Sequence, residues 1–185
     1  FNPPIAYQAA YQQPTGSRFG GDALYHGTNR KSGAKLSYYF KAIPENERDT
    51  ISNWDTLKLQ IFDGDRLIRT LKQKAPKENG VQHWRWYMTE KGVQRPSKSS
   101  KKPKSEPSGV EVLPGAYRVI LDYGNLSSET SIEVKSDPRV MKTAEAQLTV
   151  YEASKQLERY KNAASKASRQ LAESKEIAEH YLTSL

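Results

Sequence analysis

The chain has 185 residues, a formal net charge of +8 at pH 7 and no cysteine, and its mean hydropathy is -0.84. This length suffices for one domain with an appendage, and we expect exposed stretches beside a compact part rather than two full domains. No run approaches the roughly 18 apolar residues of a membrane-spanning helix, and the absence of cysteine excludes disulfides and thiolate metal sites without deciding the compartment.

Residues 1–33 are expected to form an extended linker or N-terminal arm. The segment contains three prolines and a Gly20-Gly21 pair, and its aromatic residues follow no sustained period. The chain begins with Phe1 rather than Met and shows no signal-peptide pattern, so we interpret it as a piece of a larger protein.

Residues 34–136 are predicted to form a β domain. The aromatic segment 34–40 is the first strand, and two alternating segments, 57–61 and 67–71, flank Asp63-Gly64, which is a strong hairpin signal. In segment 81–88, Trp84, Trp86 and Met88 share one face, and we expect both faces of that strand to be partly covered.

Two later strands complete the β domain. Tyr117, Val119 and Leu121 point one way after a turn at Pro114-Gly115, and Thr130, Ile132 and Val134 form the inward face of the last strand. Six or seven strands with hairpin turns between them predict an immunoglobulin-like antiparallel β-sandwich. The predicted fold class is therefore mainly β, with a helical appendage.

A basic segment interrupts this domain at about 91–109, where we expect a disordered loop. Between Lys91 and Lys104 there are six basic residues and no acidic one, in a Ser/Pro/Lys-rich context without aromatic side chains. Nucleic-acid binding is not expected because nothing there would stack on a base, although weak polyanion binding through this loop stays an alternative to a solvated loop.

Residues 137–185 are predicted to form a long amphipathic helix. Asp137-Pro138 ends the sheet, no glycine or proline follows, and Thr143 is the expected N-cap. Thirteen positions follow alternating steps of three and four residues, as in a coiled coil. They are Thr143, Ala146, Val150, Ala153, Leu157, Tyr160, Ala164, Ala167, Leu171, Ser174, Ala178, Tyr181 and Leu185.

This stripe predicts an interaction surface, with Val150, Leu157, Tyr160, Ala164, Ala167, Leu171, Ala178 and Tyr181 as its site residues. A helix on the order of 60 Å long exceeds a small sandwich. We therefore expect its first turns to pack on the sandwich, and the remainder on the parent protein or on a second copy.

No catalytic, cofactor or metal site is expected. The three histidines lie in separate segments without metal-ligand spacing, and Asp63-Gly64-Asp65 lacks the other ligands of a calcium loop. There is no nucleophile elbow and no glycine-rich phosphate loop.

The tryptophans leave two alternatives open. Trp84, Trp86 and Tyr87 would suit a sugar-stacking platform, which makes a carbohydrate-binding module the alternative function. Core or interface packing is the more common role of such residues in a sandwich, and we favour it.

Five segments carry a family resemblance, in a fixed order and spacing. They are 33–40 (GAKLSYYF), 59–71 (LQIFDGDRLIRTL), 80–86 (GVQHWRW), 112–119 (VLPGAYRV) and 134–139 (VKSDPR). Together they resemble the C-terminal region of bacterial, Bacteroidetes-type proteins with sortilin-like BNR-repeat β-propellers, which are often labelled glycosyl hydrolases. In that family the propeller is followed by a flagellar hook-cap-like immunoglobulin module, Asp-Pro-Arg and a long helix.

Two departures accompany the resemblance. The family's Asn-Arg-x-x-Trp-Asp-Leu-Arg run appears here with Gln82-His83 before the tryptophans and Tyr87-Met88 after them, and Asn29-Arg30-Lys31-Ser32 stands where the family has Pro-Pro. The resemblance implies a secreted or envelope parent, periplasmic in the latter case, with any hydrolytic site in the propeller. It supports a non-catalytic accessory module that packs within the parent or mediates protein assembly.

Overall fold

The computed structural model describes residues 1–9, 31–50, 52–97 and 106–183. Its elements, in chain order, are β1 Ala6–Gln8, β2 Ala34–Phe40, the short 3-10 helix η1 Glu45–Glu47, β3 Thr56–Asp63, β4 Arg66–Lys74, β5 Gly80–Trp86, β6 Thr89–Lys91, β7 Ser108–Glu111, β8 Gly115–Tyr123, β9 Leu126–Ser136 and α1 Ala144–Thr183.

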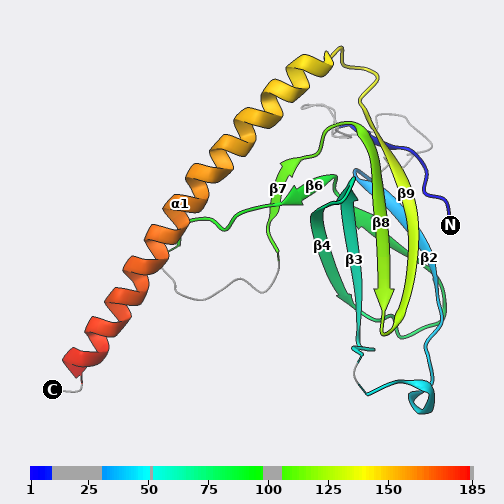
Figure 1. Ribbon diagram of the computed structural model, residues 1–185, viewed down its shortest axis with the longest axis horizontal. Coiled ribbons are helices and arrows are strands. Elements are labelled where there is room, and N and C mark those ends of the chain that lie inside the picture. The colour runs from blue at the N-terminus through cyan, green and yellow to red at the C-terminus, as the bar shows by residue number, and fades with distance from the viewer. Residues whose placement is uncertain (10–30, 51, 98–105, 184–185) are drawn as a thin grey trace, which may run out of the picture.

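Two sheets form the body of the molecule (Figure 1). The larger has the strand order β1-β9-β8-β3-β4, and the smaller consists of β2 and β5. Strands β6 and β7 pair with each other and project from the body toward α1, so we call them the arm. The predicted fold class, a mainly β sandwich with a long C-terminal helix, is confirmed.

The β3–β4 hairpin forms where the sequence predicts it. Gly64 in its turn has a φ of 58°, a conformation that glycine adopts without the steric cost of a side chain. The ladder shifts register between Ile61 and Phe62, which adds a bulge next to the turn.

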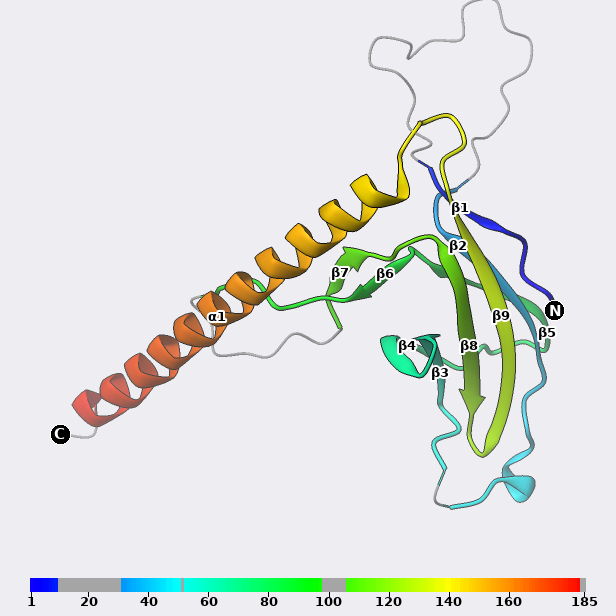
Figure 2. The ribbon, with the colours of Figure 1, turned by 45° about the horizontal axis from the view of Figure 1, so that its top comes forward.

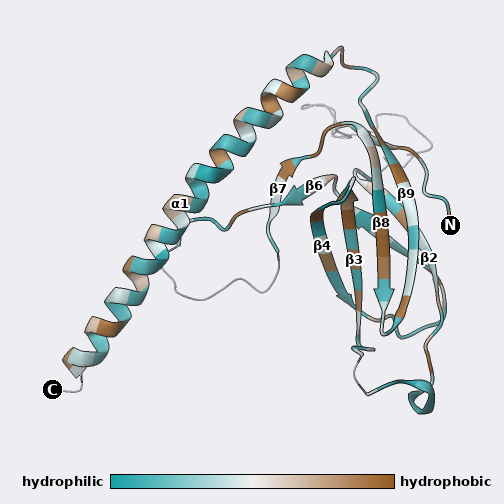
Figure 3. Cartoon of the chain, viewed as in Figure 1, coloured by the Kyte–Doolittle hydropathy of each residue, from teal (hydrophilic) through white to brown (hydrophobic). Residues whose placement is uncertain are grey.

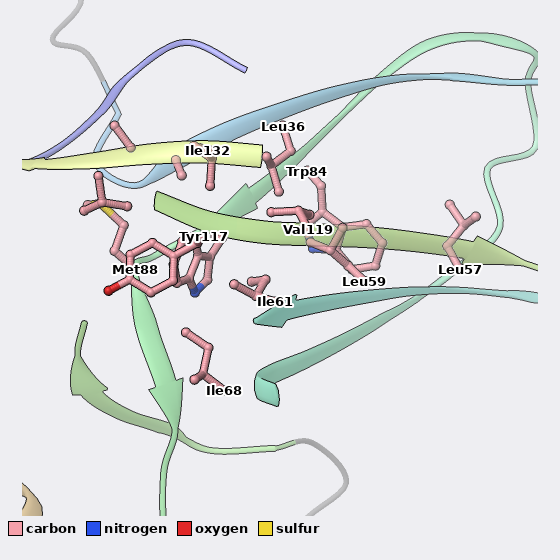
Figure 4. Close-up of a cluster of buried hydrophobic side chains, with 14 of the residues drawn as sticks. Leu36, Leu57, Leu59, Ile61, Ile68, Trp84, Met88, Tyr117, Val119 and Ile132 are labelled. Atoms are coloured by element: carbon pink, nitrogen blue, oxygen red, sulfur yellow. The ribbon is translucent and has the colours of Figure 1, made fainter. Parts of the chain in front are cut away.

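Apolar side chains from both sheets fill the space between them (Figure 4). Leu36 and Trp84 from the smaller sheet lie near Leu59 and Val119 from the larger, and Ile61 is fully buried. The inward positions predicted for β8 and β9 hold, since Tyr117, Val119, Ile132 and Val134 are buried and Leu121 packs partly buried against them. Period-2 alternation therefore identified the core correctly in these strands.

The strand predicted at 81–88 ends earlier, at Trp86. Met88 has a φ of 55°, an unusual value for a residue with a side chain, and the chain changes direction there from β5 into β6. Trp84, Trp86 and Met88 are buried as one face, but Val81 and Tyr87 on the other face are exposed. Arg85 on that face is partly buried, so the outer face of β5 is covered only in part, and the larger sheet packs against the inner face alone.

Two boundary predictions also need correction. Within residues 1–33, which were predicted to be an extended linker, β1 joins the larger sheet. It pairs parallel with β9, so this sheet is not wholly antiparallel. Three residues are too few to show a period, and the pairing therefore escaped the sequence. At the basic loop, Lys91 and residues 108–109 belong to β6 and β7, whereas the centre of the segment, 98–105, lies outside the described residues.

The C-terminal helix is one continuous element that runs past the arm and away from the body (Figure 2). The Thr143 hydroxyl accepts a hydrogen bond from the Ala146 amide at 3.2 Å, which confirms the predicted N-cap. With 40 residues, α1 is about 60 Å long. Residues 137–143 form the connection from β9 rather than the first turns of the helix.

Candidate functional site

The predicted interaction stripe lies on the exposed side of α1. Leu157 is 67% exposed and Leu171 73%, and Val150, Tyr160 and Tyr181 are similarly accessible. The alanines of the stripe, Ala146, Ala153, Ala164, Ala167 and Ala178, are exposed as well. Leu185 lies outside the described residues.

The first turns of α1 do not pack this stripe on the sandwich, contrary to the prediction. The helix instead faces the body with a neighbouring stripe, one residue later in each repeat. Its members are Gln147, Tyr151, Ser154, Glu158, Lys161, Ser165, Ser168 and Ala172. Successive residues are about 100° apart around a helix, so the two stripes look in clearly different directions. Figure 3 shows the resulting alternation of apolar and polar patches along α1.

A buried carboxylate on the arm holds the helix. Glu90 of β6 is only 4% exposed. Its Oε1 accepts hydrogen bonds from Tyr151 Oη at 2.6 Å and Arg66 Nη2 at 2.9 Å, and its Oε2 accepts one from Lys155 Nζ at 2.9 Å. Lys155 also pairs with Glu158 at 3.0 Å. We call Glu90, Arg66, Tyr151, Lys155 and Glu158 the clamp.

Opposing effects set the pKa values in the clamp. Burial alone would raise the pKa of Glu90, but hydrogen bonds from Arg66, Tyr151 and Lys155 outweigh it and hold the pKa below its ordinary value. Burial would likewise lower the pKa of Lys155, whereas its contacts with Glu90 and Glu158 raise it. Glu90 is therefore ionised at neutral pH, and its charge is matched by cations from β4 and α1.

A second buried side chain fastens the arm to the sandwich. Arg69 of β4 donates through Nη1 to the carbonyl oxygens of Glu90, at 2.9 Å, and Pro107, and through Nη2 to that of Glu106 at 3.1 Å. The Glu106 carboxylate in turn accepts the Thr70 amide at 3.1 Å. Because these contacts fix β6 and the residues just before β7 to β4, the arm presents Glu90 to α1 from a fixed place.

Close backbone approach brings the arm against α1. A Cβ atom on Gly109 of β7 would lie 2.7 Å from Glu158 Oε1 and 2.7 Å from the Lys91 carbonyl oxygen. Any side chain here would turn the Glu158 carboxylate out of its place and push the backbone of the opposite strand away. Gly109 is thus part of the clamp's geometry.

Two further contacts hold α1 on either side of the clamp. Near its start, Gln147 Nε2 donates to Ser136 Oγ at 2.7 Å, and farther along, Ser168 Oγ donates to the Ser97 carbonyl at 2.8 Å. A groove of about 400 Å³ separates the first turns of the helix from the end of the sandwich. It is lined by Gln8, Glu111, Asp137, Lys142, Gln147 and Val150 among others.

The proposed sugar platform is not assembled on the surface. Trp86 is 1% exposed and donates its indole N–H to the Thr89 carbonyl at 3.0 Å, and Trp84 is also buried. Only Tyr87 is accessible, at 62% exposed. The two tryptophans pack in the core because they share the inward face of β5.

Other candidate groups are scattered. His83 is exposed and its Nδ1 lies 3.0 Å from Ser37 Oγ, His180 lies in α1, and His26 is outside the described residues. Across the described ranges, no three His, Cys, Asp or Glu side chains are grouped so that they could hold a metal ion. None of the helices in the described part of the chain combines the length and the apolar composition needed to cross a membrane.

Sequence reasoning missed the clamp. The only available signal was a group of polar residues at helical spacing beside the apolar stripe, namely Tyr151, Lys155 and Glu158. Nothing local marks Glu90 as buried, since it lies in a strand of only three residues.

Comparison with known proteins found no matching family model, no matching curated protein and no matching solved structure.

Proposed function

We propose that this chain is a non-catalytic structural module that packs against a second protein molecule through the apolar stripe of α1. The observation that carries the proposal is the orientation of the helix, whose polar stripe faces its own body while its apolar stripe stays exposed to solvent. An accessible apolar surface of this length is typical of a protein–protein contact.

The clamp supports this reading. Glu90 and Arg69 fix the arm and helix through buried, charge-assisted hydrogen bonds, although the helix gains little apolar burial from the contact. Such an arrangement stabilises one direction of the apolar stripe relative to the sandwich. A surface held in a fixed direction binds with less loss of conformational entropy than a mobile one.

We extend the proposal to the context that the family resemblance implies. There the module braces a β-propeller in a secreted or envelope protein, and any hydrolytic activity belongs to the propeller. Reading the coding sequence upstream of Phe1 tests this context, because propeller repeats are expected there.

Site-specific photo-crosslinking tests the contact itself. Tyr160, at the middle of the stripe, is replaced by benzoylphenylalanine and irradiated in the cells that produce the protein. We expect a protein adduct whose peptides can be identified by mass spectrometry. The matched control carries the same probe at Leu148, which is exposed on the same helix but off the stripe. Equal labelling from both positions, or none from Tyr160, would contradict the proposal.

A further inference from the structure

We infer that the partner of this stripe is the same stripe on a second copy of the chain, with the two α1 helices antiparallel. The inference rests on the proposed function and names the occupant of that surface. It is argued from the area of the stripe, the sizes of its side chains and the distribution of charge.

The area of the stripe matches a small symmetric interface. A helix about 60 Å long and about 10 Å wide offers on the order of 600 Å² per copy, or about 1,200 Å² in total. This total lies at the lower end of the range for specific protein–protein interfaces. Two copies can therefore form a reversible dimer through α1 alone.

The side-chain sizes favour the antiparallel direction. One antiparallel register, with its two-fold axis near Asn162, places almost every large residue opposite a small one of the second copy. The facing pairs are Thr143 with Tyr181, Ala146 with Ala178, Val150 with Ser174, Ala153 with Leu171, Leu157 with Ala167, and Tyr160 with Ala164. Alternation of large and small residues across an interface fills it evenly.

A parallel, in-register pair would pack less evenly. It would place Leu157 and Tyr160 each against its own counterpart, directly before layers that contain only Ala164 and Ala167. The spacing between the helices would then have to vary from layer to layer, which leaves gaps at the alanines.

The charge distribution favours the same direction. Helix α1 contains six acidic and six basic residues, so it is formally neutral and the net charge of +8 lies outside it. An antiparallel pair places the two positively charged bodies toward opposite ends of the paired helices. A parallel pair would bring the two bodies side by side, where their charges repel. At moderate salt this repulsion is strong only within about 10 Å, so separating the bodies in the antiparallel pair removes most of it.

The free edge of the stripe also tolerates a second copy. The positions that flank it on the side away from the body are Thr149, Gln156, Ala163, Gln170 and Ile177, all exposed and uncharged. On the side toward the body, the inferred register brings Lys161 close to Lys161 of the second copy. This single like-charge pair is expected to weaken the dimer slightly.

Sedimentation equilibrium of the full chain tests self-association. We expect a reversible monomer–dimer equilibrium that Leu157→Glu and Leu171→Glu each weaken by about 100-fold or more, because each substitution occurs twice per dimer. Leu148→Glu, the same change off the stripe, should leave the equilibrium constant unchanged. Circular dichroism should show that all three variants keep their helix, since all three leucines are exposed.

Cysteine cross-linking tests the direction, and the chain contains no other thiol. A mixture of Ala146→Cys and Ala178→Cys copies should form a disulfide-linked dimer under mild oxidation, whereas neither variant alone should do so. Cross-linking of each variant with itself would instead indicate parallel helices and overturn the inferred direction.

The outcomes separate this inference from the proposed function. A chain that stays monomeric at every concentration overturns the second copy as partner. If photo-crosslinking from Tyr160 then yields peptides of another protein, the proposed function still holds; if it yields none, both fail. Tighter association of Lys161→Gln would support the inferred register.

Discussion

The sheet-to-sheet interface and the helix-to-body interface are built from opposite kinds of side chain. Between the sheets, apolar residues such as Ile61, Trp86 and Val134 are buried, as the hydrophobic effect requires. Between α1 and the arm, the contact is made by Glu90, Tyr151 and Lys155. The first interface stabilises the fold, whereas the second fixes a direction. Destabilising the two should therefore have different consequences.

Truncation in the core should have the largest effect. Trp86→Ala removes a buried indole that contacts the Tyr117 ring edge to face, with centroids 5.4 Å apart. We expect a loss of about 3–5 kcal/mol in the free energy of unfolding, measured by urea denaturation. Tyr87→Ala, next to it but exposed, should change that free energy by less than about 0.5 kcal/mol. Similar losses for both variants would contradict the buried placement of Trp86.

Removal of the clamp charge should release the helix without unfolding the sandwich. In Glu90→Gln the buried carboxylate that joins Arg66 and Lys155 is lost, and hydrogen bonds to charged groups are each worth about 1.5–3 kcal/mol. We expect faster amide hydrogen exchange at residues 147–161, with the protection of β3 and β8 retained. Glu152→Gln, which alters an exposed acid of the same helix, is the control. Equal loss of protection in the sheet would mean that the two interfaces are not separable.

Acid should reproduce the effect of that substitution. The clamp holds the pKa of Glu90 below its ordinary value of 4.5. The contribution of ionised Glu90 to the free energy of helix docking is therefore complete above pH 4.5 and is lost as the pH falls through the lower, folded-state pKa. The contribution of the raised pKa of Lys155 to helix docking is complete below its ordinary value of 10.5 and is lost only as the pH rises through the higher, folded-state pKa. The protection of residues 147–161, taken as the ratio of the intrinsic exchange rate at the same pH to the observed rate, should therefore fall more steeply with acid in the natural chain than in Glu90→Gln. Parallel curves would exclude Glu90 as the responsible group.

A methyl group on the arm should weaken the clamp by a smaller amount. Gly109→Ala places a Cβ 2.7 Å from Glu158 Oε1 and 2.7 Å from the Lys91 carbonyl oxygen, so the carboxylate has to turn away from its place beside Lys155 and the backbone at Lys91 has to shift. We expect a cost of about 1–2 kcal/mol in helix docking, measured by the same exchange experiment. Gly115→Ala is the matched control, because the nearest atom to its Cβ is 4.0 Å away, in Tyr117.

The smallest effect is expected on the outer stripe of a monomer. Leu157→Glu at low protein concentration should shift the free energy of unfolding by less than about 0.5 kcal/mol, because Leu157 is already exposed to solvent. A large shift at a concentration where the chain is monomeric would show that the stripe packs within its own chain.

The sequence predicted those parts of the fold that depend on local patterns. The Asp63-Gly64 turn, the alternation of Tyr117 and Val119, and the continuous helix after Thr143 all follow from conformational preference and period. The parallel pairing of β1 and the arm do not, because each involves strands of three or four residues whose partners are distant in the chain. Short strands are specified by their neighbours rather than by their own period.

The candidate site was only half predictable. The stripe through Leu157 and Leu171 was identified correctly as a surface of the helix, yet its spacing does not say which neighbour it faces. The direction of the apolar stripe depends on the polar stripe next to it, whose residues face the body, and on Glu90, which holds the helix there. Glu90 is a charged residue of a type usually found at the surface. Burial of a carboxylate requires three converging donors, and these come from β4 and from two turns of α1.

The long, straight course of α1 beyond the clamp makes it a lever. Thr183 lies 28 residues beyond Lys155, which corresponds to about 42 Å of helix. With the Ser168 contact to the Ser97 carbonyl released, a tilt of about 10° at the Glu90 contact would move the far end of the helix by about 7 Å. Small adjustments of a few hydrogen bonds at the arm become displacements larger than a side chain at the tip, so the clamp determines where the far end of α1 is aimed.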